Sequence, residues 1–150
     1  MKTLILFYSL SGNTKAFAEK KARELGADIE EILEEKKASM ISVWVFGVSR
    51  ALKRQTVPIK PIKSQISSYD TIIIMSPVWA GKPTPAINSV FALLPPGAKV
   101  EIIMVSAGGG TPKSSGGTKT LLTTRGCEVI GYTDVKVKRD QNGIAVQELD

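Results

Sequence analysis

Short, continuously apolar segments recur along the chain, and stretches with helical periodicity follow most of them. An unbroken apolar run is typical of a strand that is covered on both faces. Apolar runs and β-branched residues predict strands at residues 4–8, 28–33, 71–75, 100–105 and 128–137. Apolar residues three and four positions apart predict helices at residues 15–25, 84–94 and 118–125. This alternation indicates one α/β domain, residues 1–150, with a parallel sheet between helical layers.

Two regions depart from the alternation. Residues 38–54 carry an apolar stripe at helical spacing and are predicted to form a helix. After the fifth predicted strand no amphipathic pattern follows. Instead, Asn142-Gly143 and the alternating Ile144 and Val146 predict a turn and a short extended tail. The last helix of the alternation is therefore expected to be missing.

Composition narrows the possible chemistry. The chain has one cysteine, Cys127, and no histidine, which excludes an internal disulfide, a cysteine-rich zinc site and histidine-based catalysis. This composition fits a reducing, cytoplasmic location best. The longest apolar runs are strand-sized and fall well short of the roughly 20 residues that cross a bilayer. No association with a membrane is therefore expected.

The positive charge is unevenly distributed. The net charge is +6, and residues 34–63 hold seven basic and two acidic side chains, a surplus of +5. We expect this segment to be a solvated connection between core elements. The alternative is a surface that binds nucleic acid or a membrane through Arg50, Lys53 and Arg54 beside Trp44. Nucleic acid is not the expected partner.

A polar loop at residues 9–14 joins the first strand to the first helix. It offers three hydroxyl groups, one amide and a glycine that lets the backbone approach closely: Ser9, Ser11, Thr14, Asn13 and Gly12. Free backbone amides and the positive helix end converge at such a loop, so it predicts a site for a dianionic phosphate. Lys15 is expected to add charge. An ordinary capped turn is the alternative, and the spacings of the common nucleotide-binding glycine motifs are absent.

Two further loops follow the third and fourth predicted strands, at residues 76–83 and 106–111. Open parallel sheets bind ligands beyond the carboxyl ends of their strands, so these loops are expected to share a crevice with the first. Trp79 is expected to stack on a planar ring, and the glycines at 108–110 to let the backbone approach the edge of that ring. A tryptophan of the core and a merely flexible loop are the alternatives.

Three segments together resemble the flavodoxin family over roughly residues 1–135: Tyr8-Ser9-Leu10-Ser11-Gly12-Asn13-Thr14, Ser76-Pro77-Val78-Trp79-Ala80-Gly81-Lys82-Pro83 and Ala107-Gly108-Gly109-Gly110. The resemblance implies a flavodoxin-like three-layer sandwich, with a five-stranded parallel sheet in the order 2-1-3-4-5 and noncovalently bound FMN. It implies that the phosphate is held by Ser9, Ser11, Gly12, Asn13 and Thr14. It implies that the isoalloxazine ring is lined on one side by Pro77, Val78, Trp79, Ala80 and Gly81, and on the other by Ser106, Ala107, Gly108, Gly109 and Gly110.

Three features depart from the electron carriers of that family. Those carriers are strongly acidic, whereas this chain has a net charge of +6. The third loop has no aromatic residue, which leaves one face of the ring open to a substrate or to a second subunit. The missing last helix leaves one sheet face uncovered, and we expect either a second subunit, in a homodimer, or residues 38–52 to cover it.

The resemblance implies an FMN-dependent redox protein in which the cofactor carries the chemistry, so neither a catalytic side chain nor a metal is expected. Two roles fit: an electron carrier with a redox partner protein, or a small reductase that uses NAD(P)H and a small acceptor. The open third loop and the basic segment slightly favour the reductase or an acidic partner. The alternative is a flavodoxin-like binding or regulatory module without a cofactor, because a fold alone does not establish a function.

Overall fold

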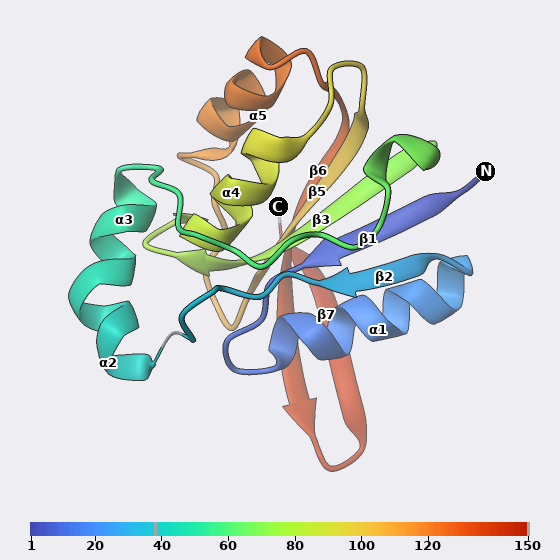
Figure 1. The fold of residues 1–150 in the computed structure, drawn as a ribbon. Helices are drawn as coiled ribbons and strands as arrows, with labels where there is room; N and C mark the ends of the chain where they lie inside the picture. The colour runs from blue at the N-terminus through green and yellow to red at the C-terminus, as the bar shows by residue number, and fades with distance from the viewer. Residues whose placement is uncertain (38, 150) are drawn as a thin grey trace.

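The computed structural model describes residues 1–37 and 39–149. Ala38, where the predicted helix at 38–54 begins, and Asp150 lie outside the described residues. Helices and strands alternate along the chain (Figure 1). The elements, in order, are β1 (Thr3–Phe7), α1 (Asn13–Leu25), β2 (Asp28–Glu31), α2 (Met40–Ser42), the π-helical turn η1 (Val43–Gly47), α3 (Val48–Leu52), the 3₁₀ turn η2 (Ile66–Ser68), β3 (Thr71–Trp79), β4 (Lys82–Pro83), α4 (Pro85–Leu93), β5 (Lys99–Ser106), α5 (Ser115–Thr124), β6 (Glu128–Asp140) and β7 (Gly143–Leu149).

Five parallel strands form the centre of the sheet in the order β2-β1-β3-β5-β6, which is the order that the resemblance implied. Two antiparallel strands that were not predicted add to these five. The short β4 pairs antiparallel with the end of β3, and β7 pairs antiparallel with β6. The extra edge strand forms because β6 runs on beyond its last partner on β5 and the chain turns back before Gly143, where φ is 120°.

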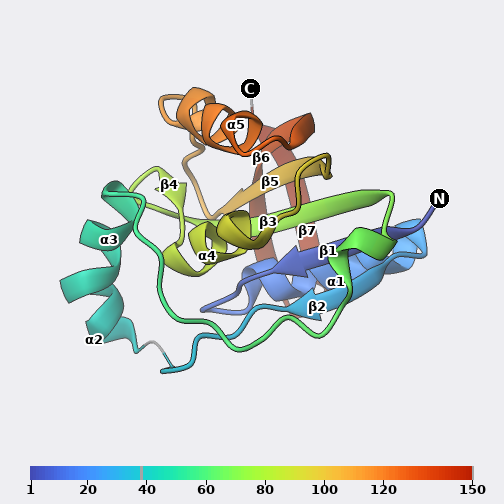
Figure 2. The same cartoon turned by 45° about the horizontal axis from the view of Figure 1, so that its top comes forward.

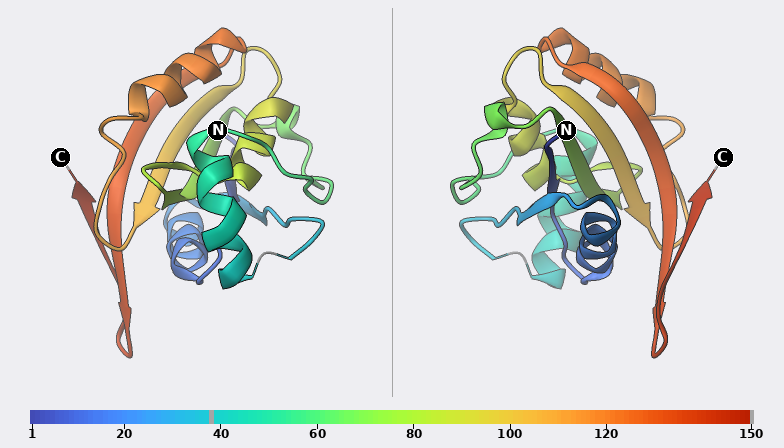
Figure 3. Two further views of the ribbon diagram at one scale, coloured as in Figure 1. Left: turned by 90° about the vertical axis from the view of Figure 1, so that its left-hand side faces the viewer. Right: turned by 90° about the vertical axis from the view of Figure 1, so that its right-hand side faces the viewer.

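Each face of the sheet has its own apolar core. On one face the even-numbered residues of β1, β3 and β5 pack against α4 and α5. On the other face the odd-numbered residues pack against α1. Figure 3 shows α1 apart from α4 and α5, on the opposite side of the strands. The fully apolar strands supply side chains to both cores, which explains why their sequences do not alternate with polar residues.

A β-hairpin stands where the last helix was predicted to be missing. Residues 137–146 extend beyond the sheet past α1 (Figures 1 and 3). At the base of the hairpin Val137 and Val146 join the core under α1, in which Ile103 and Val105 are at most 3% exposed. The expectation that residues 38–52 cover this face is therefore wrong. Within this segment α3 contacts β3 and β4 instead, at the end of the sheet (Figure 2).

The predicted helices form, with shifted ends. The helix from α2 to α3 contains a π-helical turn at η1, and α5 begins three residues before its predicted start. Thr84 caps α4 as predicted, since its Oγ1 accepts the Ile87 amide at 3.4 Å and Pro85 follows it. Of the helices in the described ranges, none combines the length and the apolar character that a bilayer crossing requires.

An extended segment at residues 53–70 connects α3 to β3 and covers part of the core on the α4 side. Its apolar side chains Val57, Ile59 and Ile62 pack against that core. Glu30 on β2 holds it in place, accepting hydrogen bonds from the amides of Lys63 and Ser64, both at 2.7 Å, and from the Ser64 hydroxyl at 2.6 Å.

Glu30→Gln is expected to lower the free energy of unfolding at neutral pH by about 1 kcal/mol, because hydrogen bonds to a carboxylate are stronger than those to an amide and solvent weakens both. Partial burial opposes ionisation, but the hydrogen bonds from Ser64 and Lys63 prevail and lower the pKa of the Glu30 carboxyl. The stabilisation is thus present above the carboxyl's unfolded pKa and is lost as the pH falls through its folded pKa. Urea titrations across this range test this: a difference between variant and wild type that persists at acidic pH contradicts it.

Candidate functional site

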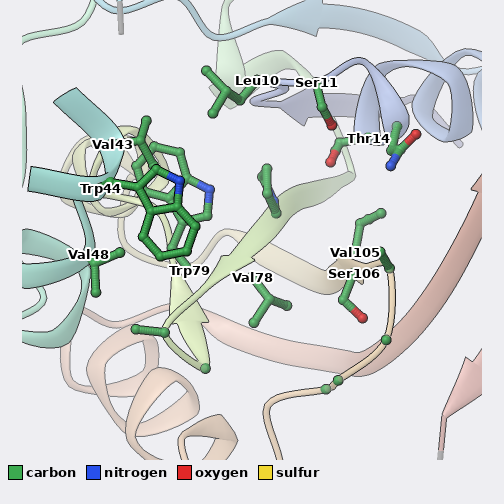
Figure 4. A pocket seen from close by; sticks show the side chains of 18 of the residues that line it. Leu10, Ser11, Thr14, Val43, Trp44, Val48, Val78, Trp79, Val105 and Ser106 are labelled. Carbon is green, nitrogen blue, oxygen red and sulfur yellow. The ribbon is translucent and has the colours of Figure 1, made fainter. Parts of the chain in front are cut away.

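A large cavity opens at the carboxyl ends of β1, β3 and β5, where a parallel sheet of this order binds ligands. Its volume is about 710 Å³, within the range of small-molecule sites. Figure 4 shows the hydroxyls of Ser11 and Thr14 toward one end and the indoles of Trp44 and Trp79 toward the other. The predicted residues that line it are Ser11, Asn13, Thr14, Pro77, Val78, Trp79, Ala80, Gly81, Ser106, Ala107, Gly108, Gly109 and Gly110.

The first loop forms one end of the cavity. Ser9 and Gly12, both predicted to contact the phosphate, do not line it. Ser9 Oγ instead accepts the amides of Gly12 and Lys15, at 3.1 and 3.2 Å, and so shapes the turn. Gly12 has a φ of 96°, which a side chain rarely tolerates.

The start of α1 leaves donors free for a ligand. No side chain at the Gly12 cap position covers it, and the amides of Asn13 and Thr14 donate to no residue within the described ranges. Thr14 is buried and lines the cavity. Two free amides at the positive end of a 13-residue helix suit an anion such as a phosphate.

The second loop turns tightly after β3. Ala80 and Gly81 have φ values of 50° and 76°, and the chain returns as β4. The Trp79 ring packs edge to face on Tyr8, with centroids 5.9 Å apart, and a Cβ on Gly47 would lie 2.9 Å from Trp79 Cζ3. Trp79 is thus both part of the core and part of the cavity wall. Burial and then the Glu34 carboxylate, which accepts the Tyr8 hydroxyl at 2.7 Å, raise the pKa of Tyr8 and keep its phenol neutral.

The third loop carries its glycines along the cavity and is anchored just beyond them. Thr111 is 1% exposed, and its Oγ1 donates to Asp134 Oδ1 at 2.7 Å. The Tyr132 hydroxyl lies 2.5 Å from Thr111 Oγ1 and donates a hydrogen bond to it, because the Thr111 proton is directed to Asp134. Burial raises the pKa of Tyr132, so its phenol stays protonated. The predicted alternative of a merely flexible loop does not hold at this end.

Thr111→Val is expected to lower the free energy of unfolding by about 1–3 kcal/mol, because the variant keeps the shape and leaves Asp134 and Tyr132 without their shared partner. Thr111→Ser, which retains the hydroxyl, is the control and is expected to lose under about 1 kcal/mol. Urea unfolding of both variants measures the difference. Equal stability of the two would show that the hydroxyl network does not anchor the loop.

Besides the three loops, a helix lines the cavity, and the sequence analysis did not predict its role there. Met40, Val43, Trp44 and Val48, on the helix from α2 to α3, face the loops across the opening. The apolar stripe at 38–54 was the available signal, but it was interpreted as cover for the sheet. Lys82 Nζ holds this helix by donating to the Leu52 carbonyl at 2.8 Å, where a cation also suits the helix end.

The charged side chains near the cavity lie outside its lining. Of the residues named as lining the cavity, none has an ionisable side chain. Lys15, expected to supply charge to the first loop, directs Nζ to Glu31 at 3.4 Å. The basic residues Lys36, Lys37 and Arg50 line a separate, smaller cavity of about 190 Å³ on the other side of Trp79.

Comparison with known proteins adds the fold family. Neither a protein-family model nor a curated protein matches the chain. A flavoprotein from Lactobacillus acidophilus NCFM, solved in complex with FMN, is 27% identical, with a TM-score of 0.74 over 89% of this chain and 92% of that one. The apo-form of the flavoprotein from that organism is 24% identical, with a TM-score of 0.65 over 87% and 91%. Flavodoxin 2 from Bacillus cereus is 18% identical, with a TM-score of 0.52 over 95% and 90%. The chain therefore has the flavodoxin-like fold that its three loop segments predicted.

Proposed function

We propose that the chain binds FMN in the 710 Å³ cavity and works in redox chemistry. The observation that carries this proposal is the free amide end of α1 at the same cavity as an uncharged wall of indole, proline and glycine. The first of these suits a phosphate and the second suits a neutral planar ring. The similar flavoprotein from Lactobacillus acidophilus was solved with FMN, which supports the proposal.

Two groups of residues would hold the two ends of FMN, one the phosphate and the other the ring. Ser11, Asn13 and Thr14 would hold the phosphate through the helix end and their polar side chains. The loops at 77–81 and 106–110, together with Trp44, would hold the ring. When bound, FMN supplies reversible uptake of one or two electrons. None of the residues named as lining the cavity has an ionisable side chain, so protons taken up in the reaction would come from water.

Thermal stability tests whether FMN binds. FMN at 100 times its dissociation constant should add about 2.7 kcal/mol to the stability of the apoprotein. A colourless protein that gains no stability from added FMN would instead support the module without a cofactor.

The role in electron transfer is also part of the proposal: either a partner protein or NAD(P)H and a small acceptor exchanges electrons at the open side of the cavity. Anaerobic mixing of the FMN-loaded protein with NADPH separates the two. Rapid loss of the visible absorption supports the reductase. An unchanged spectrum supports a carrier that depends on a protein partner.

The homodimer stays a prediction. The exposed apolar surface that could form it lies on α2 and η1, not on the sheet face. Met40, Ile41, Trp44, Val45 and Phe46 are 57–78% exposed, beside the opening of the cavity. An apolar surface of this kind is typical of a protein contact. Sedimentation velocity at micromolar concentration is expected to show a dimer, and a monomer across that range would contradict it.

A further inference from the structure

The hairpin formed by β6 and β7 places a guanidinium group on the first loop. Arg139 Nε donates to Asn13 Oδ1 at 2.7 Å, and Nη2 donates to the Ser11 carbonyl at 3.0 Å. The group lies against Gly12, since a Cβ built on that glycine would be 3.0 Å from Nη1. The two segments in contact are more than 120 residues apart in sequence.

The pairing and packing of the hairpin hold Arg139 in this position. Alternate residues of a strand face the same side, and Val135 and Val137 are buried under α1. Arg139 continues that row beyond the last partner on β5, and it pairs with Ile144 on β7. The partly buried Ile144 and Val146 pack into the same core, which fixes the returning strand. The strand register therefore directs Arg139 toward the start of α1.

The charge of Arg139 is not neutralised by its contacts. Both of its acceptors, a carbonyl and a side-chain amide, are neutral. Within residues 1–37 and 39–149 no carboxylate forms an ion pair with it. The neighbouring Asp140 accepts the Asn142 amide at 2.7 Å. The guanidinium has five N–H donors, and the two contacts use two of them.

We propose that Arg139 is a phosphate-recognition residue, which favours FMN over the dephosphorylated flavin by bringing positive charge to the first loop. This inference rests on the proposed function, because it assigns the phosphate to that loop. The lining itself has no charge, and Lys15 is engaged with Glu31, so Arg139 supplies what the loop lacks. Arg139 is exposed, and a cation beside an anion at the protein surface still contributes enough to change affinity by about an order of magnitude.

The test compares FMN with riboflavin, which has the same ring and no phosphate, by fluorescence titration of the apoprotein. Arg139→Gln is expected to weaken FMN roughly tenfold and riboflavin less than about twofold. Arg139→Lys, which keeps the charge and loses the planar fork, is expected to retain most of the preference for FMN. Lys138→Gln is the matched control: it removes the same charge from the adjacent, outward-facing position and should change neither affinity by more than about twofold.

The outcomes separate the possible roles of Arg139. Equal losses for FMN and riboflavin in Arg139→Gln would show that the side chain only holds the loop in shape and would overturn the proposal. So would an unchanged FMN affinity, or an Arg139→Lys variant as poor in FMN binding as Arg139→Gln. If the wild-type protein binds riboflavin and FMN equally, the phosphate site itself is wrong. If it binds neither, the proposed function fails.

Discussion

Thr14→Ala is expected to weaken FMN binding by roughly 10- to 100-fold, which corresponds to the loss of a hydrogen bond to a charged group. Thr14 is 2% exposed and is the second residue of α1, at the cavity. Its hydroxyl and its free amide lie where the helix end favours an anion. Titration of the apoprotein with FMN measures the loss.

Two comparisons make this result specific. Riboflavin lacks the phosphate, so Thr14→Ala should change its affinity by less than about threefold. Thr14→Ser retains the hydroxyl and should bind FMN within about threefold of the wild type. Equal losses for both flavins, or a serine variant as weak as the alanine variant, would remove Thr14 from phosphate binding.

Trp79→Ala is expected to lower the free energy of unfolding by about 2–4 kcal/mol, somewhat below the cost for a fully buried aromatic ring. The ring fills the space between Tyr8 and Gly47 and forms part of the wall between the large cavity and the smaller basic one. Its removal should join the two cavities. It should also shift the visible absorption and the reduction potential of bound FMN, because the stacking surface is lost.

Trp44→Ala is the matched control for the loss of stability. Its indole lines the same cavity but is 74% exposed, so its removal should cost less than about 1 kcal/mol of stability. Urea unfolding and the spectrum of the FMN-loaded protein give both readouts. An unchanged spectrum in Trp79→Ala would place the flavin ring away from that indole.

The features that local pattern determines could be predicted from the sequence. Fully apolar runs such as 71–75 identify central strands because both of their faces are buried. Thr84 and Pro85 identify a helix start because their backbone chemistry is local. The three loops could be assigned to one crevice because parallel strands bring their carboxyl ends to the same edge of a sheet. The first two inferences are local, and the third needs only the parallel order of the strands.

The predictions that failed concern contacts between segments far apart in the sequence. The stripe at 38–54 indicates a helix, but no residue in it specifies whether its apolar side meets the sheet or the cavity. Lys15 is adjacent to the phosphate loop in sequence, yet it pairs with Glu31. Arg139 reaches the same loop because of the hairpin's length and register. Asn142-Gly143 predicted the turn, but neither the length of the paired strands nor the direction of Arg139 follows from that dipeptide.

The most direct test of the account is the visible spectrum of the freshly purified protein, together with identification of the compound that it releases on denaturation. We expect a yellow protein that releases FMN, and apoprotein that regains the spectrum when FMN is added. A colourless protein whose apoprotein neither takes up FMN nor gains stability from it would contradict the central claim.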